Sequence, residues 1–154
     1  MRDLQPVSTD DYIAIQRLMG RAADAVTRGD LDQFIGCWTE DAVWTIGLTR
    51  GSLAGRSTIL KNFQHIRDDL DAIVQTVDNG DAWYDGKGAE VAHARFYVTE
   101  LIRRRTGENL LLRFFYTDRL VRADGGWLFA ERVLNPLYVG PYDLSGPFHS
   151  SSSP

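Results

Sequence analysis

The sequence predicts an α+β domain in which N-terminal helices pack on one face of a curved, mainly antiparallel sheet. Two features of the pattern support this class. Apart from a strand over 42–48, apolar residues recur at helical spacing up to residue 70 and then alternate with a period of two. Turn-rich stretches such as "DGKG" and "RADGG" separate the alternating segments and favour an antiparallel meander. A sheet of this kind wrapped around a long helix makes a cone-shaped α+β barrel with a pocket open at one end.

The first helix is predicted over residues 10–28, with Gly29 closing it. Ser8 or Thr9 precedes the helical pattern and is the candidate N-cap. Five apolar residues at helical spacing form the stripe that we expect to be buried: Ile15, Leu18, Met19, Ala22 and Val26. Asp24 falls on the opposite side among arginines, so it is expected in a solvated charged face.

A second, short helix is predicted from Leu31 to about Trp38. Asp30 can cap it, with Gln33 as the second half of a capping box. The only cysteine, Cys37, lies in the apolar phrase "FIGCW", which favours a buried and inert thiol.

The strand over 42–48 is followed by a loop, "SLAGRS", and by a third helix that Ser57 caps and that ends near residue 70. Four long strands complete the predicted order of elements: 72–84, 88–102, 110–121 and 126–134.

The composition limits the class of protein and its partners. A chain of 154 residues predicts a single domain over 1–154, with a core of about 8–135. A net charge of −4 argues against nucleic acid as a partner, because nucleic-acid-binding surfaces are basic. There is no long apolar run to cross a membrane, and a lone cysteine fits a reducing compartment, so we expect a cytoplasmic protein.

The C-terminal segment, 136–154, is rich in proline, serine and aromatic residues. We expect it to be a tail that lies over the pocket as a lid or reaches across a neighbouring subunit. Bulky apolar residues occur on both faces of the predicted strands, so the outer face of the sheet should also be covered. A homodimer or homotrimer is therefore expected.

Several phrases carry a resemblance to a known family: "AIQRLMGRAADAVTRGDLDQF", "CWTEDAVWTI", the Gly-Arg-Ser helix start and "YTDRLVRADGGWLFAER". In this order they resemble the SnoaL-like branch of the nuclear transport factor 2-like superfamily, over roughly residues 10–135. The resemblance implies the cone-shaped fold. It leaves the activity open, because this fold is used by dehydratases, isomerases, cyclases, dehydrohalogenases and pure binding proteins.

Within that branch the sequence looks most like the dehydrochlorinase and scytalone-dehydratase-like subgroup. The resemblance implies a Tyr or Lys and then an Asp on the first helix, and a His at the start of the first long strand. The matching positions here are Ala22, Thr27 and Gln75. None of these side chains can act as a base at neutral pH, so the usual Asp–His pair is absent from this sequence.

Alternation, read with the register of the family, predicts which residues of the last three strands face the pocket. The predicted inward sets are Ala92, Ala94, Phe96, Val98 and Glu100; Leu111, Arg113, Phe115 and Thr117; and Leu128, Ala130, Arg132 and Leu134.

Seven side chains are therefore candidate ligand-binding groups: Thr27, Trp44, Gln75, Phe96, Arg113, Phe115 and Arg132. Trp44 either lines the pocket or only fills the core. Arg113 and Arg132 either bind an anionic or enolate-like ligand or are structural ions paired with Glu100 or with carboxylates of the outer face. The histidines are far apart and no phosphate-binding or dinucleotide motif occurs, so we expect no metal and no cofactor.

The expected ligand is a small hydrophobic, ring-containing molecule. One hypothesis is a cofactor-free lyase or isomerase with an atypical site, in which Glu100 is the candidate base and an arginine stabilises the oxyanion. The alternative is a non-catalytic ligand-binding or oligomeric assembly module that kept the pocket and lost the catalytic pair. The sequence leaves the choice between enzyme and binding protein open.

Overall fold

The computed structural model describes residues 4–47, 51–86, 88–144 and 147. The described strands form one seven-stranded sheet in the order β1-β4-β5-β6-β7-β2-β3. The elements are β1 (Gln5–Pro6), α1 (Thr9–Arg28), α2 (Leu31–Ile35), β2 (Trp38–Ile46), β3 (Ser52–Ala54), α4 (Arg56–Asp68), β4 (Leu70–Tyr84), β5 (Val91–Arg104), β6 (Asn109–Ala123) and β7 (Gly126–Pro141).

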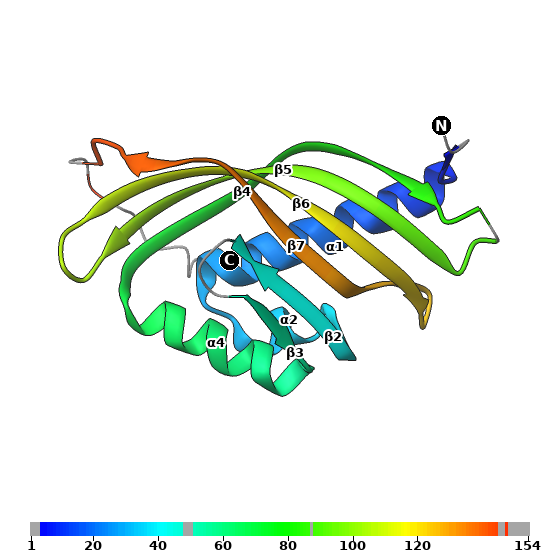
Figure 1. Ribbon diagram of the computed structural model, residues 1–154, viewed down its shortest axis with the longest axis horizontal. Helices are drawn as coiled ribbons and strands as arrows, with labels where there is room; N and C mark the ends of the chain where they lie inside the picture. Colours follow the sequence, from blue (N-terminus) through cyan, green and yellow to red (C-terminus); the bar gives the residue numbers. More distant parts are fainter. Residues whose placement is uncertain (1–3, 48–50, 87, 145–146, 148–154) are drawn as a thin grey trace.

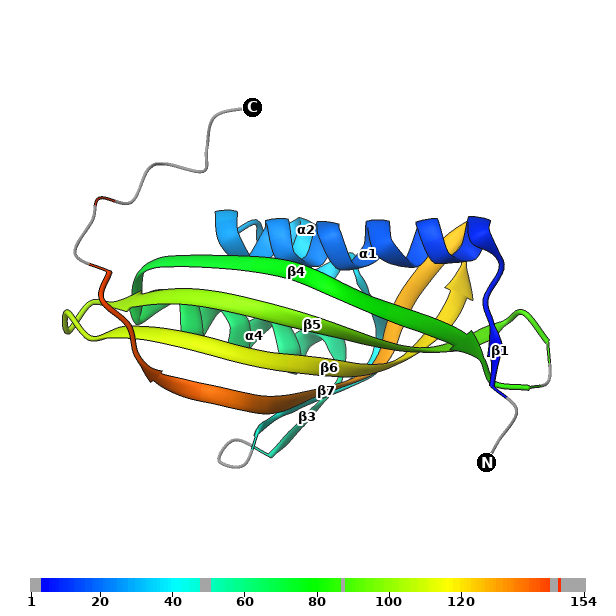
Figure 2. The ribbon, with the colours of Figure 1, turned by 90° about the horizontal axis from the view of Figure 1, so that it is seen from above.

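The sheet is strongly curved and open, and the described helices lie on its concave side (Figures 1 and 2). Strands β4 to β7 are antiparallel neighbours and arch over α1, while β2 runs parallel to β7. The predicted α+β class is confirmed. Among the described residues, no helix is both long enough and apolar enough to cross a bilayer.

Helix α1 begins and ends where its capping residues require. The Ser8 hydroxyl accepts a hydrogen bond from the Asp11 backbone N–H at 3.2 Å, so Ser8 is the N-cap. Gly29 follows the last turn at φ 70°, a left-handed conformation that strains residues with a Cβ. All five residues of the predicted stripe are buried, which confirms the face that α1 turns towards the sheet.

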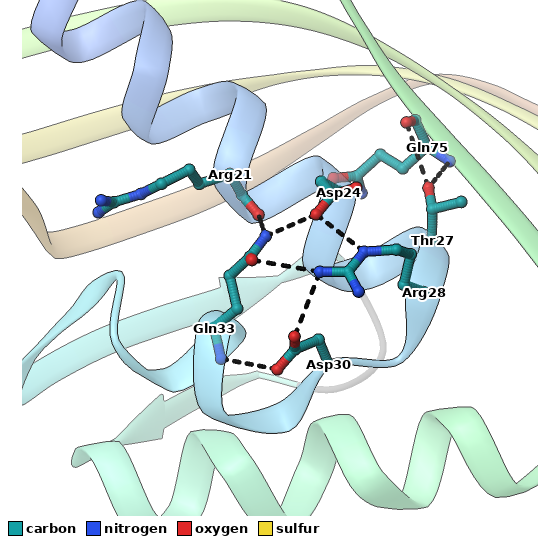
Figure 3. A network of polar contacts seen from close by, with 7 residues as sticks. All are labelled: Arg21, Asp24, Thr27, Arg28, Asp30, Gln33 and Gln75. Atoms are coloured by element: carbon teal, nitrogen blue, oxygen red, sulfur yellow. Dashed lines mark hydrogen bonds and ion pairs between the residues drawn. The ribbon is translucent and has the colours of Figure 1, made fainter. Parts of the chain in front are cut away.

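A polar network on the outer face of α1 holds the joint between α1 and α2 (Figure 3). Asp30 caps α2 by accepting from the Gln33 backbone N–H at 3.0 Å, as predicted. The prediction that Gln33 completes a capping box with Asp30 is wrong. Its side-chain amide instead donates to Arg21 O at 2.8 Å and to Asp24 Oδ2 at 2.7 Å. Arg28 bridges Asp24 and Asp30 at 3.0 and 3.2 Å. The network therefore ties α2 to the outer face of α1.

Helix α2 is shorter than predicted, since it ends at Ile35 and Trp38 already belongs to β2. Trp38 is 1% exposed and packs between Phe34 and Phe129, with ring centroids 5.7 and 5.2 Å apart. A helical continuation would carry this indole away from the strands. Packing against the sheet thus ends α2 early.

The predicted cap of α4 is also wrong. The helix begins at Arg56 with Gly55 as its N-cap, and Ser57 lies inside its first turn. The backbone N–H of Gly55 donates to Ala42 O at 2.8 Å, so pairing with β2 sets where the helix starts. Residues 52–54, predicted as a loop, form β3 beside β2. Leu48, the predicted end of the preceding strand, lies outside the described residues.

The predicted inward face is confirmed in β5 and wrong in β6. In β5 the alternate residues from Ala92 to Glu100 are buried. In β6 the buried set is Phe114, Tyr116, Asp118 and Leu120. The predicted set, Leu111, Arg113, Phe115 and Thr117, lies on the outer face of the sheet. Both faces of β6 carry large apolar residues, so alternation alone does not decide which one is buried.

Strand β7 changes face at a bulge. Ala130 is an extra residue in β7 with no partner in β6. Before it, Phe129 is buried in the core, and after it Arg132 and Leu134 face the concave side. The predicted inward positions of Leu128 and Ala130 are therefore wrong, while those of Arg132 and Leu134 are confirmed.

Strand β7 also extends beyond the expected core. Residues 136–141, placed in the tail by the sequence, continue β7 and pair with β6. Residues 145–146 and 148–154 lie outside the described residues. The end of the strand and the turn after it expose four large apolar side chains: Leu137, Tyr138, Val139 and Tyr142. This surface fits the expected homodimer or homotrimer interface, which stays a prediction.

A cluster around Asp11 ties the start of α1 to three strands. Asp11 accepts two hydrogen bonds from Arg122 at 2.8 and 2.9 Å, one from the Tyr84 hydroxyl at 2.5 Å and one from the Trp127 indole at 3.2 Å. These hydrogen bonds lower the pKa of Asp11 to about 2, although burial opposes the effect. The bonds from Arg122 contribute most, and those from Tyr84 and Trp127 contribute less.

Asp11→Asn is expected to destabilise the protein by about 2 kcal/mol at pH 7. Because the pKa of Asp11 is lower in the folded state, its ionised carboxylate stabilises the fold. This contribution is complete at pH values above the ordinary pKa of 3.8 and is lost as the pH falls through about 2. The difference between variant and wild type should therefore shrink in urea unfolding at pH 2.5. Asp10→Asn, at an exposed neighbour, is the control and should change stability by less than about 0.5 kcal/mol. An equal loss at both pH values would contradict the ionic role of Asp11.

Candidate functional site

A cavity of about 210 Å³ lies between α1, α2, α4, β2 and the concave face of the sheet. Its wall is mainly apolar and aromatic, with Phe34, Trp44 and Phe63 among the lining residues. An apolar protein cavity of about 150 Å³ holds benzene, so this one can accept a substituted single ring. The hollow required by the pocket interpretation is present.

Glu100 is a buried carboxylate that lines this cavity, whereas Asp69, which also lines it, is exposed. Glu100 projects from β5 and is 8% exposed. The Gln75 amide on the neighbouring strand donates to Glu100 Oε1 at 2.5 Å. Burial raises the pKa of Glu100 from 4.5 to about 7, although the hydrogen bond from Gln75 opposes the rise. Near neutral pH the group is thus able both to accept and to return a proton.

Neither candidate arginine neutralises Glu100. Arg132 lines the cavity but makes a two-bond ion pair with Asp118, at 2.7 and 2.9 Å. Burial raises the pKa of Asp118, although the charge of Arg132 opposes this effect. Arg113 lies on the outer face, half exposed, with Asp78 at 3.5 Å. Of the two roles considered for Arg132, the structure therefore shows the paired structural ion, with Asp118 as its partner.

Aromatic rings enclose the Arg132 guanidinium. Its Cζ lies 3.7 Å from the ring centroid of Tyr116 and 3.8 Å from that of Phe129. Its Nη2 also points to the Met19 sulfur at 3.0 Å, which connects the ion pair to α1. Within the described residues its Nη1 makes no hydrogen bond. Arg132 itself lines the cavity.

The two positions that match the family's Asp and His act together as a backbone anchor. The Thr27 hydroxyl accepts a hydrogen bond from the Gln75 backbone N–H at 3.0 Å (Figure 3). Thr27 thus lies behind Gln75, while the Gln75 side chain lines the cavity and reaches Glu100. Asp24 cannot replace the missing acid, because its side chain lies on the outer face of α1, where it is bonded to Arg28 and Gln33.

Of the three aromatic candidates, only Trp44 lines the cavity. Trp44 lines the cavity and also packs in the core, where its ring is 5.5 Å from that of Trp38. Phe96 is buried beside Tyr12, outside the cavity wall. Phe115 is on the outer face of the sheet, where the guanidinium of Arg95 covers its ring at 4.0 Å. The candidates that the cavity brings together are therefore Trp44, Gln75, Glu100 and Arg132.

Sequence reasoning missed Tyr116, which is 4% exposed and lines the cavity. The register predicted for β6 puts its side chain on the outer face of the sheet, which is wrong. Asp118 held the signal that could have corrected this, because Asp118 and Arg132 are direct partners across β6 and β7. A buried charge needs a partner of opposite charge, so an inward-facing Arg132 requires an inward-facing Asp118 and hence an inward-facing Tyr116 two residues away.

Among the described residues, no group of three or more His, Cys, Asp or Glu side chains is arranged to hold a metal ion. His93 lies near the surface with Asp85 at 3.3 Å, and His65 is exposed. His149 lies outside the described residues.

The sequence matches the SnoaL-like domain family over residues 7–133. This protein belongs to that family. Among proteins of curated function, none matches the sequence. The resemblance drawn from the motifs is thus confirmed for the family, and the departures at Thr27 and Gln75 are departures within it.

Several solved structures share the fold. A candidate aromatic ring hydroxylase from Novosphingobium aromaticivorans has a TM-score of 0.80 at 22% identity, covering 88% of this chain and 96% of its own. A type 2 hexachlorocyclohexane dehydrochlorinase, LinA, has a TM-score of 0.78 at 20% identity, covering 92% and 95%. A candidate scytalone dehydratase from N. aromaticivorans has a TM-score of 0.77 at 20% identity, covering 89% and 93%. At these identities the likeness shows the fold.

Glu100→Gln is expected to stabilise the ligand-free protein at pH 8 and to leave its stability unchanged at pH 4. The folded pKa of about 7 exceeds the ordinary value of 4.5, so the wild type loses stability as pH rises through this interval. The difference in free energy of unfolding should approach about 3 kcal/mol in urea titrations. Glu131→Gln, on the exposed face of β7, is the matched control and should show no such pH dependence. A pH-independent effect of Glu100→Gln would contradict the raised pKa.

Proposed function

We propose that this protein is a cofactor-independent lyase or isomerase that acts on small, ring-containing, mostly apolar molecules, with Glu100 as the general base. The observation that carries the proposal is a buried carboxylate with a pKa of about 7 in an apolar cavity the size of one substituted ring. A base with this pKa removes a proton from carbon and returns it near neutral pH.

The polar side chains at and around Glu100 have separate parts in the proposed reaction. Glu100 takes the proton, and the Gln75 amide fixes which carboxylate oxygen remains available by bonding to the other at 2.5 Å. Thr27 holds the Gln75 backbone in place. Arg132 is oriented by Asp118 and offers Nη1 to negative charge that develops on the substrate. The apolar wall excludes water, which strengthens both effects.

The names of two similar structures support this class of reaction. One is named as a dehydrochlorinase and the other as a candidate dehydratase, both of which are names of elimination reactions, and the substrate named in the first is a chlorinated six-membered ring. The residues that would do the chemistry here differ from the Asp–His pair implied by the family resemblance. The proposal is thus that the fold retains its cavity and takes its base from β5.

The proposed function is tested by exchange of carbon-bound hydrogen with D2O. Wild-type protein is incubated with single-ring ketones such as cyclohexanone and cyclohexenone, and deuterium uptake is followed by mass spectrometry. We expect catalysed uptake that rises about tenfold per pH unit up to about pH 7 and then levels off. Glu100→Gln should lower the rate at least about 100-fold.

Glu131→Gln is the control and should exchange at the wild-type rate. An unchanged rate in Glu100→Gln would remove Glu100 from the mechanism. Ligand binding without exchange by the wild type would instead identify the non-catalytic ligand-binding protein, the alternative favoured by Thr27 and Gln75 in place of an acid and a base.

A further inference from the structure

We infer that the Arg67 side chain binds a carboxylate group of the ligand at the opening of the cavity, and that the ligand is therefore a ring-containing carboxylic acid held with its ring inward. This inference rests on the proposed function and deepens it, because it names the substrate class. It assigns a role to a cation that the sequence reasoning did not single out.

The exposure of the lining residues locates the opening of the cavity. Most of the described lining is buried or half-buried, whereas Asp69 and Arg104 are exposed. Both lie where α4 passes into β4 and where β5 ends, because Leu70 of β4 pairs with Arg104 of β5. Glu100 lies four residues earlier in β5 and is almost fully buried. A ligand therefore enters past the end of α4 and meets the buried carboxylate further in.

Arg67 lies at this opening. It is in the last turn of α4, is partly buried, and lines both the cavity and an adjoining surface pocket beside Arg28 and Gly29. Its Nη1 donates to Val26 O at 3.3 Å, near the end of α1. A Cβ at Gly29 would lie 3.0 Å from Nη2 and 3.1 Å from Nε, so the glycine leaves the space that the guanidinium occupies. Arg67 is thus held between the end of α1 and the cavity.

No carboxylate of the described residues forms an ion pair with Arg67. Burial lowers the pKa of Arg67, and no acidic neighbour opposes this effect. The other cation at the opening, Arg104, is already paired with Glu108 at 3.2 Å. A partly desolvated guanidinium without an acid is stabilised by a carboxylate placed beside it. Arg67 therefore favours an anionic group on a ligand at the opening.

The surroundings of Arg67 determine which anion fits. The planar guanidinium matches the two oxygens of a carboxylate. Asp69 is an acid at the same opening, and its carboxylate repels a dianion such as a phosphate monoester more strongly than a monoanion. The neighbouring wall is apolar, with Phe63, Ile66 and Leu70, and suits a ring. A ring-containing carboxylic acid satisfies all three conditions.

The test measures binding of three single-ring ligands by isothermal titration calorimetry at pH 7. They are benzoate, the neutral isostere benzamide and the dianion phenyl phosphate. The wild type should bind benzoate more tightly than either of the others. Arg67→Gln should weaken benzoate binding about 10- to 100-fold and leave benzamide binding unchanged, because only charge-assisted hydrogen bonds are lost.

Lys61→Gln is the matched control, since it removes a cation from an exposed position of the same helix, and it should bind benzoate as the wild type does. Arg67→Lys keeps the charge without the planar fork and should weaken benzoate binding by a smaller factor. It takes the place of Arg67→Gln if that variant does not fold.

A wild type with no preference for benzoate over benzamide would overturn the inference. Equal benzoate binding by the wild type and the folded variant would also overturn it. So would an equal loss of both ligands, because that result identifies a structural role for Arg67. Tighter binding of phenyl phosphate than of benzoate would reject the carboxylate as the bound group.

The result is separable from that of the proposed reaction. A preference for benzoate that depends on Arg67, without D2O exchange by the wild type, would contradict the proposed function and leave this inference intact. D2O exchange that depends on Glu100, without any preference for benzoate, would support the proposed function and overturn this inference.

Discussion

The ion pair between Asp118 and Arg132 is the constraint on which the site depends. Both side chains are almost fully buried, and each would be strongly destabilising without the other. Their two hydrogen bonds fix the pairing of β6 and β7, and the guanidinium in turn positions the rings of Tyr116 and Phe129. Arg132 is paired with Asp118, and the raised pKa of Glu100 comes from burial, opposed only by the hydrogen bond from Gln75. The same contact thus joins β6 to β7 and leaves the second buried carboxylate, Glu100, without a cationic partner.

Two pairs of buried polar side chains lie at the cavity and have different roles. Asp118 and Arg132 satisfy each other as ions, while Gln75 and Glu100 are joined by one hydrogen bond from a neutral amide. A neutral partner orients a carboxylate without holding it in the charged form as firmly as a cation does. Burial raises the pKa of both acids, but a cation opposes the rise at Asp118 and only a neutral amide opposes it at Glu100. This difference explains how a SnoaL-like chain without the Asp–His pair retains a titratable group in its pocket.

Much of the fold was predictable because α1 and β5 have one apolar face each. Ile15, Leu18 and Val26 mark the buried side of α1, and Ala92 to Glu100 mark that of β5. Strand β6 has large apolar residues on both faces, so its register depends on a partner in another strand. Glu100 could be found as the polar residue in a small, apolar series. Tyr116 could not, since its orientation depends on an ion pair between residues far apart in the sequence.

The bulge at Ala130 has a consequence for how this family can vary. In a regular strand, residues three apart face opposite sides, yet Phe129 and Arg132 both face the interior. The extra residue therefore lets an aromatic platform and the cation that rests on it come from one short segment. A single-residue insertion or deletion in β7 would separate them and reverse the charge pattern of the cavity wall. A change of length at this point would thus change which side chains of β7 line the cavity while leaving the order of the strands intact.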